Sequence, residues 1–267
     1  MSRAGPGIVV AVVAALLAAL PAAIAGTIMP HRALYDLSLA STRASGGVVG
    51  VEGRMMFQWG DSCDGWTIEQ RYRMRLIQAQ EDVVDISSNL VTWESRDGLR
   101  YRFTLRKKRG AESEEEIRGS ARLAARGGAG TAEFTRPEIE TIELPAGTMV
   151  PTAHTIELIR RAESKATLFS QKVFDGSEIE SPAEVNAVIG RLQQADPEEA
   201  KGNPLLARPG WRVRLAFFPA EGQAPQPDYE IGLKLLDNGV STDMIIDYGD
   251  FSVRARLREL EALPGGC

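Results

Sequence analysis

Alternation of apolar and polar residues along most of the chain is the feature that most limits how it can fold. In one such segment Trp66, Ile68 and Tyr72 alternate with Glu69 and Arg71. A period of two puts successive side chains on opposite faces of a β-strand, so that one face is buried and the other meets water. Similar rows occupy the segments 35–39, 49–59, 99–105, 211–217, 229–235, 244–247 and 251–257. The pattern predicts antiparallel sheet.

Turn signals separate these rows at regular intervals. They are Gly46-Gly47, Gly60-Asp61, Asp97-Gly98, Gly127-Gly128 and Asn238-Gly239. About ten strands in a flat open sheet would leave long edges exposed, so the sheet is expected to curl or close on itself. The sequence therefore predicts an all-β, mainly antiparallel, barrel-like fold.

The segment 151–166 breaks the period of two. Thr152 or Thr155 can serve as a helix N-cap, and Leu158 and Ile159 follow at helical spacing. We predict one amphipathic helix here.

Two later stretches are less regular. The segment 185–192 fits either a strand or a helix. The segment 194–210 is rich in proline, glycine and charge, which predicts a long loop.

The start of the chain has the three parts of a secretory signal peptide. Arg3 is followed by an apolar run at 8–20, then by Pro21 and by Ala23-Ile24-Ala25, which predicts cleavage before Gly26. An uncleaved membrane anchor is the alternative, but the apolar run is shorter than the roughly 20 residues that span a bilayer. We predict a signal peptide at 1–25 and a single β-domain at 26–267, which functions outside the cytoplasm.

The net charge of the chain is −5. A mildly acidic total argues against nucleic acid as the main partner. No later stretch is apolar enough to cross a membrane as a helix, so the exported protein is expected not to span one.

Two cysteines are present, Cys63 and Cys267, and Cys267 is the last residue. In an oxidising compartment an isolated pair most simply forms a disulfide. The alternative is a free thiol with a catalytic or metal-binding role.

Residues that carry common enzyme chemistry are scarce. His31 and His154 are the only histidines, and no G-x-S-x-G, H-E-x-x-H, P-loop or G-x-G-x-x-G motif occurs. His154 lies near the predicted helix start, where a packing or capping role is the default and a triad role is the alternative. The sequence predicts no catalytic residues, no metal site and no cofactor.

Arginines recur on one face of several predicted strands. The ones that we single out are Arg71, Arg73, Arg75, Arg100 and Arg102. Such rows can be an ordinary solvated face, paired across strands with acidic residues. They can also form a basic surface for an anionic envelope component or a partner protein. On the second interpretation, charge reversal at Arg73 and Arg102 would abolish envelope association.

A curled sheet with an apolar interior can also hold a lipid chain. The candidate lining residues are Met55, Phe57, Trp59, Tyr72, Met74 and Phe103. The alternative is that these side chains only fill the core.

Several short motifs in order resemble one known family. Pro30-His31-Arg32-Ala33 is followed by Cys63-x-Gly65-Trp66, by Leu144-Pro145-x-Gly147-Thr148 with Pro151 and His154, by Phe174-Asp175-Gly176, and by Asp247-Tyr248-Gly249-x-Phe251 before Cys267. This order resembles the EipB family of Gram-negative cell-envelope integrity proteins, over nearly the whole exported chain. Candidates for a role in the fold or in binding are the motif residues His31, Trp66, His154, Asp247 and Tyr248.

The resemblance implies a periplasmic, spiral-like open β-barrel with a disulfide between Cys63 and Cys267. It implies a role in keeping the envelope intact under stress, without known catalytic residues, and tetratricopeptide-repeat proteins of the periplasm as partners. The function expected from the sequence is therefore non-catalytic binding of an envelope protein or component. A carrier of lipid or lipoprotein acyl chains is the alternative, and an envelope hydrolase is a distant third.

Overall fold

The computed structural model describes residues 28–43, 47–80, 82–180, 182–200, 202–219 and 225–265. The predicted signal peptide at 1–25 and Cys267 lie outside these residues. In the described part, fifteen strands form one sheet. The strands are β1 (His31–Thr42), β2 (Val48–Asp61), β3 (Gly65–Gln78), β4 (Val83–Ser95), β5 (Arg100–Arg109), β6 (Glu115–Leu123), β7 (Gly130–Arg136), β8 (Glu140–Leu144), β9 (Thr148–Met149), β10 (Leu168–Val173), β11 (Ala183–Gln193), β12 (Gly210–Phe218), β13 (Tyr229–Leu236), β14 (Ser241–Asp247) and β15 (Phe251–Ala262).

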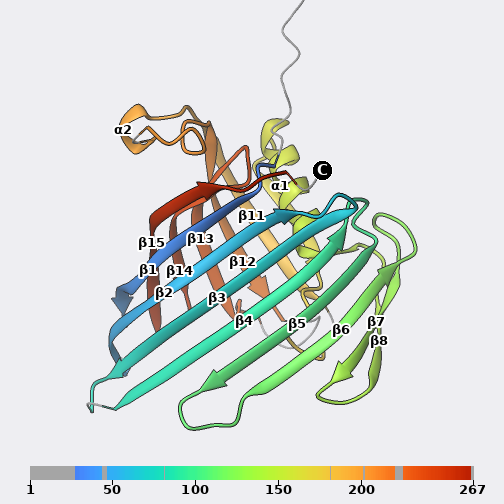
Figure 1. Ribbon diagram of the computed structural model, residues 1–267, viewed down its shortest axis with the longest axis horizontal. Helices are drawn as coiled ribbons and strands as arrows, with labels where there is room; N and C mark the ends of the chain where they lie inside the picture. The colour runs from blue at the N-terminus through green and yellow to red at the C-terminus, as the bar shows by residue number, and fades with distance from the viewer. Residues whose placement is uncertain are drawn as a thin grey trace, which may run out of the picture.

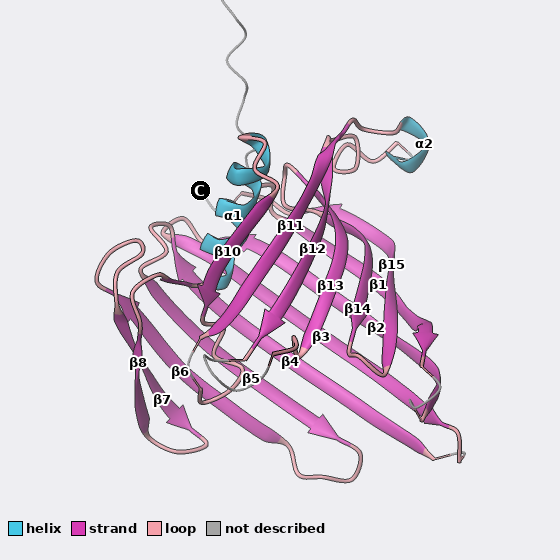
Figure 2. Ribbon diagram, turned by 180° about the vertical axis from the view of Figure 1, so that it is seen from behind, coloured by secondary structure: helices cyan, strands magenta, loops and turns pink. Residues whose placement is uncertain are grey.

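The first strand lies in the middle of the sheet. From β1 the strands follow one another outward to β8 on one side, and from β15 back to β9 on the other. Each neighbouring pair is antiparallel except β9 and β10, which are parallel. The sheet curls into a nearly closed barrel (Figures 1 and 2), and within the described residues β8 and β9 do not pair to close it. The predicted all-β, open-barrel fold is confirmed.

Two local features of β2 depart from a regular strand. A Cβ atom added to Gly53 would lie 2.4 Å from the carbonyl oxygen of Arg73 on the next strand, so only glycine permits this close approach. A register shift between Val48 and Gly50 marks a bulge in β2. Because of this bulge Val49 points outward and is 54% exposed, so its predicted place in an inward row is wrong.

The predicted helix is present as α1 (Pro151–Glu163) and ends three residues before the predicted boundary. Its buried residues include Leu158 and Ile159, as the helical spacing predicts. The predicted cap at Thr152 or Thr155 is wrong, because Val150 occupies the N-cap position and forms no side-chain capping bond. The helix stands beside β10, at one end of the barrel (Figure 2).

The two irregular stretches are also resolved. The segment 185–192 belongs to strand β11, which pairs with β10 and β12. Its alternating burial pattern is that of a half-buried strand. The predicted loop at 194–210 holds the single helical turn α2 (Pro197–Ala200).

The buried side chains on the inner face form three large clusters. One lies under α1 and includes Trp59, Leu158 and Trp211. The second lies along β5–β8, where Phe103 packs against Phe134. The third joins β1, β2, β3 and β15. The interior is thus divided into neighbouring packed regions, while the outer face of β1–β5 carries mostly polar residues.

Candidate functional site

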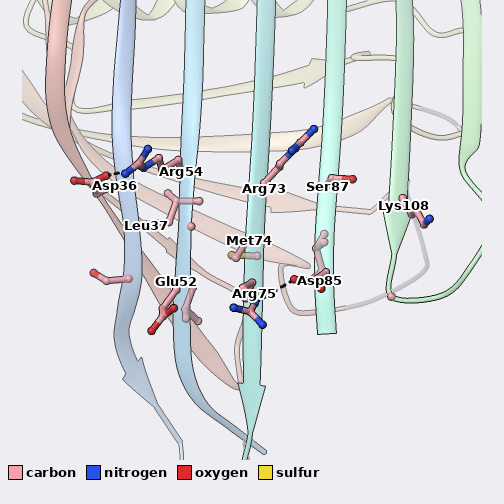
Figure 3. A pocket seen from close by; sticks show the side chains of 15 residues that line it. Asp36, Leu37, Glu52, Arg54, Arg73, Met74, Arg75, Asp85, Ser87 and Lys108 are labelled. Atoms are coloured by element: carbon pink, nitrogen blue, oxygen red, sulfur yellow. Dashed lines mark ion pairs between the residues drawn. The ribbon is translucent and has the colours of Figure 1, made fainter. Parts of the chain in front are cut away.

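A hollow on the outer face crosses the strands β1–β5. The register of the strands aligns one residue from each in a row, which forms one wall of this groove (Figure 3). The row consists of Asp36, Arg54, Arg73, Ser87 and Lys108. We call the hollow the outer groove.

A second row forms the opposite wall. It consists of Ser38, Glu52, Arg75 and Asp85, each two residues along its strand from the first row. Leu37 and Met74 also border the groove, but both side chains are buried, so they contribute main chain to its floor. The groove has a volume of about 1020 Å³, which is enough for a small ligand or a head group.

The cations of the outer groove differ in their partners. Arg54 lies 3.7 Å from a carboxylate oxygen of Asp36, and Arg75 lies 3.3 Å from one of Asp85. Arg73 and Lys108 have no acidic partner among the residues that the structure describes. Arg54 and Arg73 also stand directly opposite each other, which raises the positive potential at this end of the groove.

The five arginines predicted as a basic surface do not form one site. Arg73 and Arg75 line the outer groove, whereas Arg71 borders an adjoining hollow and pairs with Glu69 of its own strand. Arg102 lies over the ring of Trp93, at 4.3 Å from its centroid, and Arg100 lies over the same ring at 5.6 Å. The structure instead adds three residues, Arg54, Ser87 and Lys108. The sequence held no signal for them, because only the strand register aligns them with Arg73.

The six residues predicted to line an apolar pocket all lie on the inner face. Met55, Phe57, Tyr72 and Met74 lie in one cluster. Trp59 belongs to the cluster under α1, and Phe103 to the cluster along β5–β8. Phe57 also packs against the cluster under α1, where its ring meets the Trp59 ring edge-on, so the structure connects five of the six and places Phe103 apart. Phe57 and Tyr72 are only partly buried.

A buried carboxylate holds the start of α1. Glu94 of β4 is 2% exposed, and its two carboxylate oxygens accept hydrogen bonds from the backbone N–H groups of Thr152 at 2.8 Å and Ala153 at 2.6 Å. These are two of the free N–H groups that begin every helix. Burial raises the pKa of Glu94 from 4.5 to about 7, against the lowering effect of these hydrogen bonds. The carboxylate thus links the sheet to the helix.

Both histidines are buried and serve packing. The His154 ring stacks on Phe169, with centroids 5.4 Å apart, and burial lowers its pKa to about 4. His31 Nδ1 lies 2.7 Å from the carbonyl oxygen of Met29, and burial lowers its pKa as well. The Nε2 atoms of both rings lack a hydrogen-bond partner in the described residues. Burial thus favours the neutral form of both rings.

The remaining motif residues lie at opposite ends of the barrel. The guanidinium of Arg96 lies over the Trp66 ring at 3.7 Å, beside the start of α1. Asp247 accepts a hydrogen bond from the backbone N–H of Gly249, and the exposed ring of Tyr248 stacks on Phe251 at 5.2 Å. These contacts form local turns and ring stacks, and they do not converge on one site.

Cys63 lies in the exposed turn between β2 and β3, with a positive φ of 64°. Two strands away, Ala262 of β15 is paired with His31, which is paired with Trp59 just before this turn. Neighbouring strands are about 4.8 Å apart, so the end of β15 lies about 10 Å from Trp59. The predicted disulfide to Cys267 involves a residue outside the described part and stays a prediction.

Among the described residues, no three histidine, cysteine or acidic side chains are grouped so that they could hold a metal ion. None of the helices in this part combines the length and the apolar character that crossing a bilayer requires.

Comparison with known proteins agrees with the motifs. The family model described as EipB-like matches residues 22–264. The cell envelope integrity protein EipB of Brucella abortus is 32% identical over 249 residues, covering 92% of this chain and 88% of that protein. The crystal structure of a β-barrel-like protein with a domain of unknown function, also from Brucella abortus, superposes with a TM-score of 0.81 at 31% identity, covering 90% of this chain and all of that one. The chain therefore belongs to the EipB-like family.

Proposed function

We propose that this protein supports the integrity of the cell envelope by binding an anionic envelope component in the outer groove. The proposal places the protein in the periplasm and assigns it no catalytic step. The name of the Brucella relative supports the envelope role. The observation that carries the binding role is the pair Arg73 and Lys108, whose charges have no acidic partner in the described part of the groove wall.

The cations of the outer groove differ in whether a carboxylate lies beside them. A surface cation beside a carboxylate is largely neutralised, as Arg75 is by Asp85. Arg73 and Lys108 keep their full charge for an incoming anion, and they extend from strands separated only by β4. An anion between them would meet two cations and the main-chain floor of the groove. This arrangement favours an anionic ligand over an apolar one.

Charge reversal tests this function. In the double variant Arg73→Glu with Lys108→Glu, we expect the partition constant for co-sedimentation with envelope membranes to fall by more than about tenfold, since each cation near an anionic surface contributes about 1 kcal/mol. Arg122→Glu is the matched control, because Arg122 is exposed on β6 outside the groove. A double variant that co-sediments like the wild type would refute the groove as the binding site.

Carriage of an acyl chain by the inner face is the second candidate function. Its support is the group of partly buried side chains around Met55 and Met74, which includes Phe57, Tyr72 and Ile86. Apolar side chains that are only partly covered can be buried further by a lipid tail.

Native mass spectrometry of protein purified from its own periplasm separates the two functions. An acyl-chain carrier is expected to retain a lipid mass that is lost in the variant Tyr72→Glu, which puts a charge on the inner face. Tyr101→Phe is a control at a side chain of another cluster. A clean apo mass in the wild type, together with groove-dependent co-sedimentation, would exclude the carrier.

A further inference from the structure

We propose that the outer groove recognises a phosphate ester, held above Ser87 between Arg73 and Lys108. This inference rests on the proposed function, since it uses the same groove, and it specifies the chemical class of the ligand. The three residues are direct cross-strand neighbours on β3, β4 and β5. Figure 3 shows them in one line along the groove wall.

The spacing of the three side chains suits a tetrahedral anion. With strands about 4.8 Å apart, the backbones at Arg73 and Lys108 flank Ser87 at equal distances on either side. An arginine presents a planar fork of donors, a lysine presents a point charge, and a serine hydroxyl can donate one hydrogen bond. Three donors approaching from three directions match the three terminal oxygens of a phosphate monoester. A carboxylate has two oxygens and would leave one donor unused.

The serine distinguishes this site from a general basic surface. Its hydroxyl forms no hydrogen bond with another described residue, and neither flanking cation has an acidic partner there. All three groups are therefore available at once. Glu52 and Asp85 lie on the opposite wall, and Asp36, on the same wall, stands three strands away from Ser87 and is paired with Arg54.

Titration with inorganic phosphate and with acetate tests the inference directly. We expect the wild type to bind phosphate with a Kd of about 1 mM and at least about tenfold more tightly than acetate. The variant Ser87→Ala keeps both cations, so it should weaken phosphate binding about threefold to tenfold and change acetate binding by less than about twofold. Arg73→Gln and Lys108→Gln should each weaken phosphate binding more, and Arg122→Gln should leave it unchanged. Circular dichroism checks that each variant is folded.

Two further probes identify the source of the phosphate. Binding to vesicles that contain phosphatidic acid in phosphatidylcholine, with loss in Ser87→Ala, assigns a lipid head group. Binding of glycerol 3-phosphate with no binding to these vesicles assigns a soluble or glycan-linked phosphate ester. Both results support the phosphate site.

Equal affinity of the wild type for phosphate and acetate overturns the inference, and so does unchanged phosphate binding by Ser87→Ala. These failures are separable from failure of the proposed function. If Arg73→Glu with Lys108→Glu loses envelope association while phosphate is not preferred, the groove function stands without a phosphate site. If phosphate is preferred but the same variant keeps its envelope association, the site stands without the envelope function.

Discussion

Cys63→Ser is expected to lower the free energy of unfolding by about 2–5 kcal/mol in oxidising buffer. The predicted partner, Cys267, is about 200 residues away in sequence, and a link over so long a loop removes much entropy from the unfolded chain. The strand register supports the pairing, because it brings Ala262 to the end of the sheet where Cys63 lies. Denaturant titration of both proteins measures the difference.

Reduction supplies the control for this prediction. In the presence of a thiol reductant the wild type should lose stability and coincide with Cys63→Ser, because neither protein then holds the link. Equal unfolding midpoints of the two proteins without reductant would show that no stabilising disulfide forms.

Glu94→Ala is expected to cost about 2–4 kcal/mol of stability at neutral pH, because it leaves the buried N–H groups of Thr152 and Ala153 without an acceptor. The loss of stability should be largest at the start of α1, where the Glu94 side chain of β4 accepts these two hydrogen bonds. Hydrogen exchange of amides in α1, compared with those of β2, measures it. The exposed Glu143→Ala on β8 is the matched control. Equal protection of α1 in Glu94→Ala and wild type would contradict the capping role.

Because the pKa of the Glu94 carboxyl group is shifted in the folded protein, we expect the stability of the protein to depend on pH. Its pKa is raised from 4.5 in the unfolded chain to about 7 in the folded protein, so the folded state binds the proton more tightly. Proton binding by Glu94 therefore stabilises the folded state by about 3 kcal/mol at a pH below 4.5. This contribution to the free energy of unfolding is lost as the pH rises through about 7. His154 has the opposite effect. Its pKa is lowered from 6.5 to about 4, so the unfolded chain binds this proton more tightly, and the folded state loses stability as the pH falls below 6.5.

The variant Glu94→Gln removes the titrating group, so a comparison with the wild type isolates the contribution of Glu94 to the pH dependence of stability. The stability difference between wild type and Glu94→Gln should shift by about 3 kcal/mol in favour of the variant between pH 4 and pH 8. A difference that stays constant over this range would show that Glu94 titrates as it does in the unfolded chain.

Strands with a clear period of two could be predicted from the sequence, and others could not. The row from Trp66 to Leu76 became β3, with its arginines outward. Strand β4 gave no such signal, because Ser88, Thr92 and Glu94 interrupt its inner face with polar residues. Glu94 is polar for a reason that lies elsewhere in the sequence, at the start of α1.

The outer groove was predictable only in part. Arg73 could be assigned to an outward row, but its neighbours Arg54, Ser87 and Lys108 are set by pairings between strands far apart in sequence. Conversely, Arg102 shares the outward pattern and lies over Trp93 instead of in the groove. Alternation reports which face a side chain takes, whereas a site depends on register.

Because β1 lies in the middle of the sheet, the folding of the barrel depends on the order in which its strands become available. Its second neighbour is β15, and the ion pair between Arg32 and Glu261 joins residues 229 positions apart. As the chain emerges from a ribosome or a translocation channel, β1 is the first of the fifteen described strands to appear, and it cannot pair along both edges until β15 has arrived. The barrel is thus completed only after β15 has emerged, and until then β1 carries an open edge that can pair with other chains. Shielding by a chaperone would matter most during this interval.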